Sequence, residues 1–140
     1  PAARPGALLV GPDGESAQWI AQAAARHGFD HAVCTKVRHG DRDVTIELPP
    51  LHAQGRAVVL LDDMASTGRT LAQAARLLRA AGAASVDVAV THALFAGDAL
   101  QALHDAGVGE VWSTDCIPHA SNAVPMAEPL AQALRSLLPA

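Results

Sequence analysis

The chain has 140 residues, half of them hydrophobic, and a formal net charge of -4. This length is enough for one domain with a substantial core and too short for two. The negative charge argues against nucleic acid or an anionic membrane surface as the main partner. Only 3% of the residues are aromatic, so base stacking on aromatic side chains is not expected as the main binding mode.

The sequence contains no apolar run of about 18 residues and no charged N-terminal segment followed by an apolar one. We therefore expect a cytoplasmic protein without a membrane anchor. The two cysteines, Cys34 and Cys116, are far apart and lack CxxC spacing. Buried free thiols are expected rather than a zinc site or a disulfide framework.

The first predicted unit is a strand, a loop and a helix. Residues 7–10 form a short apolar run, and apolar residues recur at helical spacing over residues 17–25, with Gly28 marking the helix end. Asp13 lies at the junction and can be a simple turn or cap residue. Alternatively, because the loops after parallel strands gather at one edge of a sheet, it faces the same ligand as the loop of a neighbouring strand.

The second unit is a predicted hairpin. Residues 31–37 suit a strand, and residues 44–48 alternate in polarity as an exposed-edge strand does. The segment between them, residues 38–43, has no apolar side chain. It is either a solvated tip or a mobile cationic loop that neutralises phosphates during a reaction. Positive charge in and next to this segment comes from Lys36, Arg38, His39 and Arg42.

Residues 58–71 are the centre of the sequence. The four apolar residues 58–61 suit a strand buried on both faces, which implies a parallel sheet covered by helices. Asp62 and Asp63 end the apolar run. A segment rich in hydroxyl side chains around Gly68 then opens a predicted helix whose apolar residues follow helical spacing.

This order of residues indicates a site for a phosphorylated sugar. Free N–H groups at a helix start bind anions, and the neighbouring hydroxyls add donors. The two carboxylates repel a phosphate, so they must face sugar hydroxyls or a Mg2+ ion that accompanies the phosphate. The glycine spacing and the missing lysine disfavour a Walker loop. The alternative is an acidic strand end with a polar helix cap and no ligand.

The remaining elements continue the alternation of strands and helices. It predicts an α/β fold with a parallel sheet flanked by helices. Strands are expected at residues 85–90, before Thr91 and His92, and at 110–114, before a loop at 115–119. Helices are expected at residues 97–106 and 129–138, and residues 124–126 form at most a short edge segment.

The central stretch resembles the phosphoribosyl pyrophosphate (PRPP) motif of type I phosphoribosyltransferases. Four apolar residues, two acids and two apolar residues precede a Ser/Thr/Gly run, with Ala65 where a larger aliphatic is usual. The resemblance implies the Rossmann-like fold of that family with a β-hairpin flexible loop. It also implies substrate binding by Asp62, Asp63, Ala65, Ser66, Thr67, Gly68, Arg69 and Thr70.

Five segments follow one another along the chain: Pro12-Asp13, Lys36-x-Arg38, the central motif, Thr91-His92 followed by Gly97, and Thr114-Asp115-x-Ile117-Pro118. In order and spacing they resemble the C-terminal domain of ribose-phosphate pyrophosphokinases (PRPP synthetases), over residues 7–135. In that family ribose 5-phosphate attacks MgATP and receives its pyrophosphoryl group, which gives PRPP and AMP. The resemblance implies that Lys36 and Arg38 are catalytic and that Asp13 contacts substrate. It also implies Mg2+ as the cofactor, with Asp13, Asp62 and Asp63 as its ligands.

The sequence departs from the family in two places. Lys36-Val37-Arg38 lacks one cation of the usual Lys-Arg-Arg, and Glu15-Ser16 replaces a glycine pair after Pro12-Asp13. The alternatives are therefore a PRPP-consuming phosphoribosyltransferase or a non-catalytic regulatory subunit of a PRPP synthetase.

The expected domain organisation is one phosphoribosyltransferase-type domain over residues 1–140. The Pro1 start without Met favours the C-terminal part of a two-domain protein. The resemblance implies that the missing domain supplies ATP contacts and that the full-length protein forms a homo-oligomer. We expect the isolated 140 residues to be inactive.

Overall fold

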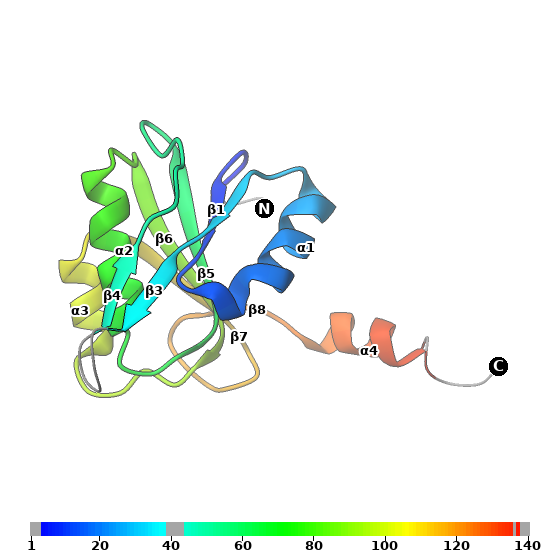
Figure 1. The fold of residues 1–140 in the computed structure, drawn as a ribbon. Coiled ribbons are helices and arrows are strands. Elements are labelled where there is room, and N and C mark those ends of the chain that lie inside the picture. The colour runs from blue at the N-terminus through cyan, green and yellow to red at the C-terminus, as the bar shows by residue number, and fades with distance from the viewer. Residues whose placement is uncertain (1–3, 39–43, 136, 138–140) are drawn as a thin grey trace.

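The computed structural model describes residues 4–38, 44–135 and 137, with the side chains of Arg38 and Val44 excepted. Its centre is a parallel sheet of six strands in the order β2-β1-β5-β6-β7-β8, with helices on both faces (Figure 1). The strands are β1 (Leu8–Gly11), β2 (His31–Val33), β5 (Ala57–Ala65), β6 (Ser85–Ala93), β7 (Val108–Thr114) and β8 (Asn122–Val124). The helices are α1 (Ala17–His27), α2 (Arg69–Ala80), α3 (Ala99–Asp105) and α4 (Ala127–Arg135), and a 3-10 turn, η1 (Gly14–Ser16), precedes α1.

The sheet separates two apolar clusters because neighbouring residues of a strand point to opposite faces. On one face, Val58 and Leu60 of β5 pack with Leu71 of α2 and Leu103 of α3. On the other face, Val59 packs with Ile20 of α1. Figure 1 shows α2 and α3 on one side of the sheet and α1 on the other. The predicted α/β fold and the central position of β5 in the sheet are confirmed. Of the apolar run predicted to be buried on both faces, residues 58–60 are buried and Leu61 is only partly buried.

The predicted strand at residues 31–37 is wrong as a single element. The structure divides it into β2 and β3 (Thr35–Arg38), and β3 pairs antiparallel with β4 (Val44–Glu47) in a separate hairpin. The division occurs at Cys34, whose N–H donates to Gly11 O at 2.9 Å in the last bond to β1. Beyond this bond the chain leaves the sheet, so the hairpin extends from the end of β2.

Several boundaries also differ from prediction. The strand expected at 110–114 begins at Val108, α3 begins at Ala99 and α4 at Ala127.

Cys34 is a buried free thiol as predicted, and burial, followed by the nearby Asp13 charge, raises its pKa to about 11. The expectation that Cys116 is buried is wrong, because it lies in an exposed loop. Among the described residues, no helix has the length and apolar character to cross a membrane.

Candidate functional site at the carboxyl edge of the sheet

The two acids of the central stretch lie within strand β5. The strand continues to Ala65 because its last residues pair with β6, from Asp62 beside Val90 to Ala65 beside Ala93. The predicted strand at residues 58–61 is therefore too short, because the two acids and the two residues after them also belong to β5. The true loop is only residues 66–68, and it connects the end of β5 directly to α2.

The helix start after this loop depends on Gly68. Its backbone is left-handed, with φ 67° and ψ 1°, and no side chain caps the first turn of α2. The first N–H groups of a helix have no partner within the helix. Here they lie next to the hydroxyls of Ser66, Thr67 and Thr70. The structure therefore contradicts the alternative that a polar side chain caps the start of α2.

A concavity of about 190 Å³ lies at this helix start. It brings together the predicted substrate-binding residues of the central stretch except Asp63, which is exposed next to Asp62. Sequence reasoning missed Met64 and Leu71 as part of the wall, although both lie within the motif. The complete lining is Asp62, Met64, Ala65, Ser66, Thr67, Gly68, Arg69, Thr70 and Leu71.

The Asp62 carboxyl lies in an electrostatically unfavourable place. Burial raises its pKa to about 7, and the charges of Asp63 and Asp13 act in the same direction. The Asp63 N–H, which donates to Asp62 Oδ1 at 3.0 Å, partly opposes this rise. A cation or a hydrogen-bond donor would relieve the repulsion, as a ligand with hydroxyl groups or an accompanying metal ion does.

Asp13 connects the loop after β1 to the hairpin. Its carboxylate accepts from the Glu15 N–H at 3.1 Å and lies 3.6 Å from Lys36 Nζ of β3. The turn reading of Asp13 therefore holds. Its charge also acts on the Asp62 carboxyl, but Asp13 is not among the described residues that line the concavity at the central loop. Glu15 is exposed, whereas Ser16 is buried and its hydroxyl donates to Asp13 O. Ser16 thus supports the turn that carries Asp13.

The predicted cationic loop is described only at its base. Arg38 ends β3 opposite Val44, and Ile46 of β4 lies in the core next to α2. The hairpin base is therefore fixed to the domain. His39 and Arg42, to which part of the cationic charge was assigned, lie outside the described residues.

The loop after β7 meets the same edge through a hydrogen-bond network. Thr114 Oγ1 donates to Thr91 O of β6 at 2.6 Å. Asn122 Nδ2 donates to Thr114 O at 2.7 Å and to Ile117 O at 3.0 Å. Asp115 Oδ1 accepts from the Met126 N–H at 2.9 Å. These bonds order the predicted junction, and they give Asp115 a structural role.

A metal ion at this edge would need ligands from a substrate. Among the residues that the structure describes, no three His, Cys, Asp or Glu side chains group as a metal site. Mg2+ is commonly held by one or two protein carboxylates together with substrate oxygens and water. Asp62 and Asp63, adjacent at the strand end and exposed to different degrees, fit that arrangement.

Comparisons with known proteins agree on one family. Residues 32–128 match the family model described as phosphoribosyl synthetase-associated domain. A ribose-phosphate pyrophosphokinase of Methanosarcina acetivorans is 38% identical over 130 residues, which cover 93% of this chain and 46% of that protein. The enzyme of the same name from Methanopyrus kandleri is 35% identical over 130 residues, covering 93% of this chain and 45% of the relative.

Solved structures give the same result. The phosphoribosylpyrophosphate synthetase of Mycobacterium smegmatis is similar with a TM-score of 0.74 and 28% identity, over 97% of this chain and 46% of that one. The orotate phosphoribosyltransferase of Aeropyrum pernix has a TM-score of 0.58 and 25% identity, over 77% of this chain and 59% of its own. The fold is that of type I phosphoribosyltransferases. The chain spans about half the length of the curated relatives it matches.

Proposed function

Since the chain belongs to the phosphoribosyl synthetase-associated domain family, we propose that it is the ribose 5-phosphate-binding part of a PRPP synthetase. In this reaction the anomeric oxygen of ribose 5-phosphate attacks the β-phosphorus of ATP, and AMP leaves. One observation carries the proposal. The open start of α2 faces a small concavity that also holds the carboxylate of Asp62.

The residues divide the substrate between them. The N–H groups of the first turn of α2 and the hydroxyls of Ser66, Thr67 and Thr70 bind the 5-phosphate. Asp62 and Asp63 accept hydrogen bonds from the ribose hydroxyls. They would also hold Mg2+ together with substrate oxygens, which would supply positive charge beside the phosphates.

The transfer step depends on cations from the hairpin. Lys36 and Arg38 stabilise the charge that moves from the transferred group to AMP, because phosphoryl transfer is catalysed mainly by positioning and electrostatics. In the present structure Lys36 contacts Asp13 at 3.6 Å. A substrate phosphate in this position would compete with Asp13 for the ammonium group.

Calorimetry of the 140-residue chain with ribose 5-phosphate, with and without Mg2+, tests the proposal. We expect Mg2+-dependent binding that Asp63→Asn abolishes. The matched control is Asp30→Asn, because Asp30 is an exposed carboxylate paired with Arg56 away from the loop. Absence of binding at millimolar sugar phosphate, or equal binding by Asp63→Asn, would refute the proposal and favour a regulatory subunit. Release of pyrophosphate from PRPP with a purine or pyrimidine would favour a phosphoribosyltransferase.

A further inference from the structure

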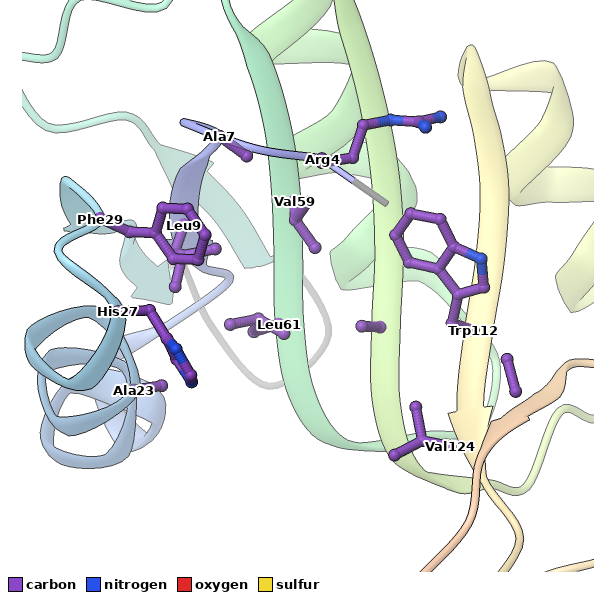
Figure 2. Close-up of a pocket in the computed structure, with 12 residues that line it drawn as sticks. Arg4, Ala7, Leu9, Ala23, His27, Phe29, Val59, Leu61, Trp112 and Val124 are labelled. Carbon is purple, nitrogen blue, oxygen red and sulfur yellow. The ribbon is translucent and has the colours of Figure 1, made fainter. Parts of the chain in front are cut away.

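The end of β7 and the segment after it carry ordered side chains that the proposed function does not use. Figure 2 shows Trp112 of β7 in the wall of a groove of about 410 Å³, on the sheet face that α1 covers. Because neighbouring residues of a strand point to opposite faces, Ser113 points to the other face, where it is buried beside Val90 of β6. Val90 belongs to the apolar cluster that α2 and α3 cover. The Ser113 hydroxyl therefore lies on the side of the sheet that also carries α2.

A chain of hydrogen bonds connects Ser113 to the ring of His119. Ser113 Oγ and Ser121 Oγ lie 2.8 Å apart, and Ser121 Oγ lies 2.7 Å from His119 Nδ1. The Ser121 N–H also donates to Nδ1, at 3.1 Å. Asn122 Nδ2 donates to Ser113 Oγ at 2.9 Å, and Asn122 Oδ1 accepts from the His119 N–H at 2.9 Å. The turn of residues 119–122 is therefore closed by its own side chains.

These bonds determine the protonation of the His119 ring. A backbone N–H can only donate, so Nδ1 accepts, and the ring is neutral with its proton on Nε2. This tautomer is inferred from the partners of the ring. The hydroxyls then form one directed series, in which Ser113 donates to Ser121 and Ser121 donates to Nδ1, and hydrogen bonds in such a series strengthen one another. The Nδ1 edge of the ring is thus fixed to the turn.

The His119 ring also contacts Phe95, in the loop between β6 and α3. The two ring centroids lie 5.2 Å apart with an interplanar angle of 48°, which is within the range of attractive aromatic pairs. On either side of Phe95 the backbone is bonded to the segment before α2, with Leu94 N–H donating to Ala65 O and Ala96 N–H donating to Ser66 O, both at 3.1 Å. Phe95 therefore joins the turn of His119 to the phosphate loop (residues 66–68).

The phosphate loop packs against the same segment at a second place. A Cβ added at Gly68 would lie 3.4 Å from Ala99 O, at the start of α3. Residues 94–99 therefore form a wall beside the phosphate loop, whose helix start has no side-chain cap. An anion site made of backbone N–H groups gains affinity when those groups are held in place before the ligand arrives, because ordering them on binding costs conformational entropy.

We propose that His119 is a positioning residue for the ribose 5-phosphate site: its ring, fixed to the turn by Ser121, holds Phe95 and with it the backbone of residues 94–96 against the phosphate loop. This inference rests on the proposed function. Neither His119 nor Phe95 is among the described residues that line the concavity. His119 therefore acts through Phe95 and not by contact with the ligand.

Amide hydrogen exchange in the ligand-free chain, followed by NMR, tests the coupling. The Ala96 N–H reports on the bond to the phosphate loop, and the Asn122 N–H, which donates to His119 O at 3.1 Å, reports on the turn. His119→Asn keeps an acceptor for the Ser121 N–H and removes the ring. It should speed exchange of the Ala96 N–H at least fivefold and leave exchange of the Asn122 N–H within twofold. Unchanged exchange at Ala96 overturns the proposal.

Phe95→Leu removes the other ring of the pair and keeps an apolar side chain. It should speed exchange of the Ala96 N–H by a similar factor. The double variant with His119→Asn should exchange no faster than the faster single variant, because both substitutions remove the same contact. Effects that multiply would show that the two rings act separately, and they would overturn the proposal.

Calorimetry with ribose 5-phosphate and Mg2+ tests the consequence for the site. His119→Asn should weaken binding at least fivefold, whereas His104→Asn, the same change at an exposed histidine of α3, should stay within twofold of the unmodified chain. A purely structural role in the turn predicts that His119→Asn, which keeps the acceptor, binds as the unmodified chain does, and that result overturns the proposal. If the unmodified chain itself does not bind the sugar phosphate, the proposed function fails, and exchange at Ala96 alone decides whether His119 holds the loop.

Discussion

Gly68 is the residue at which the backbone geometry of the proposed phosphate loop can be tested most directly. Its φ of 67° lies in the left-handed region, and an added Cβ would meet Ala99 O at 3.4 Å, an ordinary contact. The cost of Gly68→Ala therefore comes from backbone strain of about 1–2 kcal/mol. A stiffer unfolded chain offsets about 0.4–1 kcal/mol of it. The net loss is about 1 kcal/mol, or a melting temperature lower by about 3–5 °C.

Gly28→Ala is the matched control for this prediction. Gly28 has nearly the same φ, 66°, at the end of α1, and an added Cβ would meet nothing within 4 Å. Thermal unfolding should show similar losses in the two variants. Calorimetry should show that only Gly68→Ala weakens ribose 5-phosphate binding, by at least tenfold, because only its strain changes the N–H groups at α2. Unchanged binding by Gly68→Ala would refute the role of the loop geometry, and an unaffected Gly28→Ala would refute the strain argument.

Three further predictions concern charged residues. The pKa of Asp62 is raised to about 7 in the folded state, so its contribution to the free energy of unfolding is complete below pH 4 and is lost as the pH rises through 7. This loss, reduced for solvent screening to about 1–2 kcal/mol, should be absent when Asp62→Asn is unfolded in urea over the same pH range. Arg4→Ala leaves the Asp87 carboxylate buried without its cation and should cost about 2–4 kcal/mol, whereas Arg56→Ala, at a surface pair, should cost at most about 0.5 kcal/mol in the same denaturation assay. Lys36→Met should change unfolding by less than about 0.5 kcal/mol and leave ribose 5-phosphate affinity unchanged in calorimetry, since Lys36 contacts Asp13 and not the loop; a lost affinity would move its role from transfer to binding.

The sequence was sufficient for the architecture because each strand and helix carries its own periodicity. Apolar runs followed by helical spacing identified β1 with α1 and β5 with α2. Glycine marked the end of α1 correctly, with Gly28 in the left-handed conformation. These signals are local, so they can be recognised without knowledge of the tertiary structure.

Boundaries that depend on a partner strand could not be predicted. Two carboxylates suggest the end of a strand, yet β5 continues through Asp62 and Asp63 because β6 is long enough to pair with them. In the same way, residues 31–37 read as one strand, and only the change of partner at Cys34 divides them. The contact between Lys36 and Asp13 is likewise tertiary, although the family resemblance assigned both residues to one site.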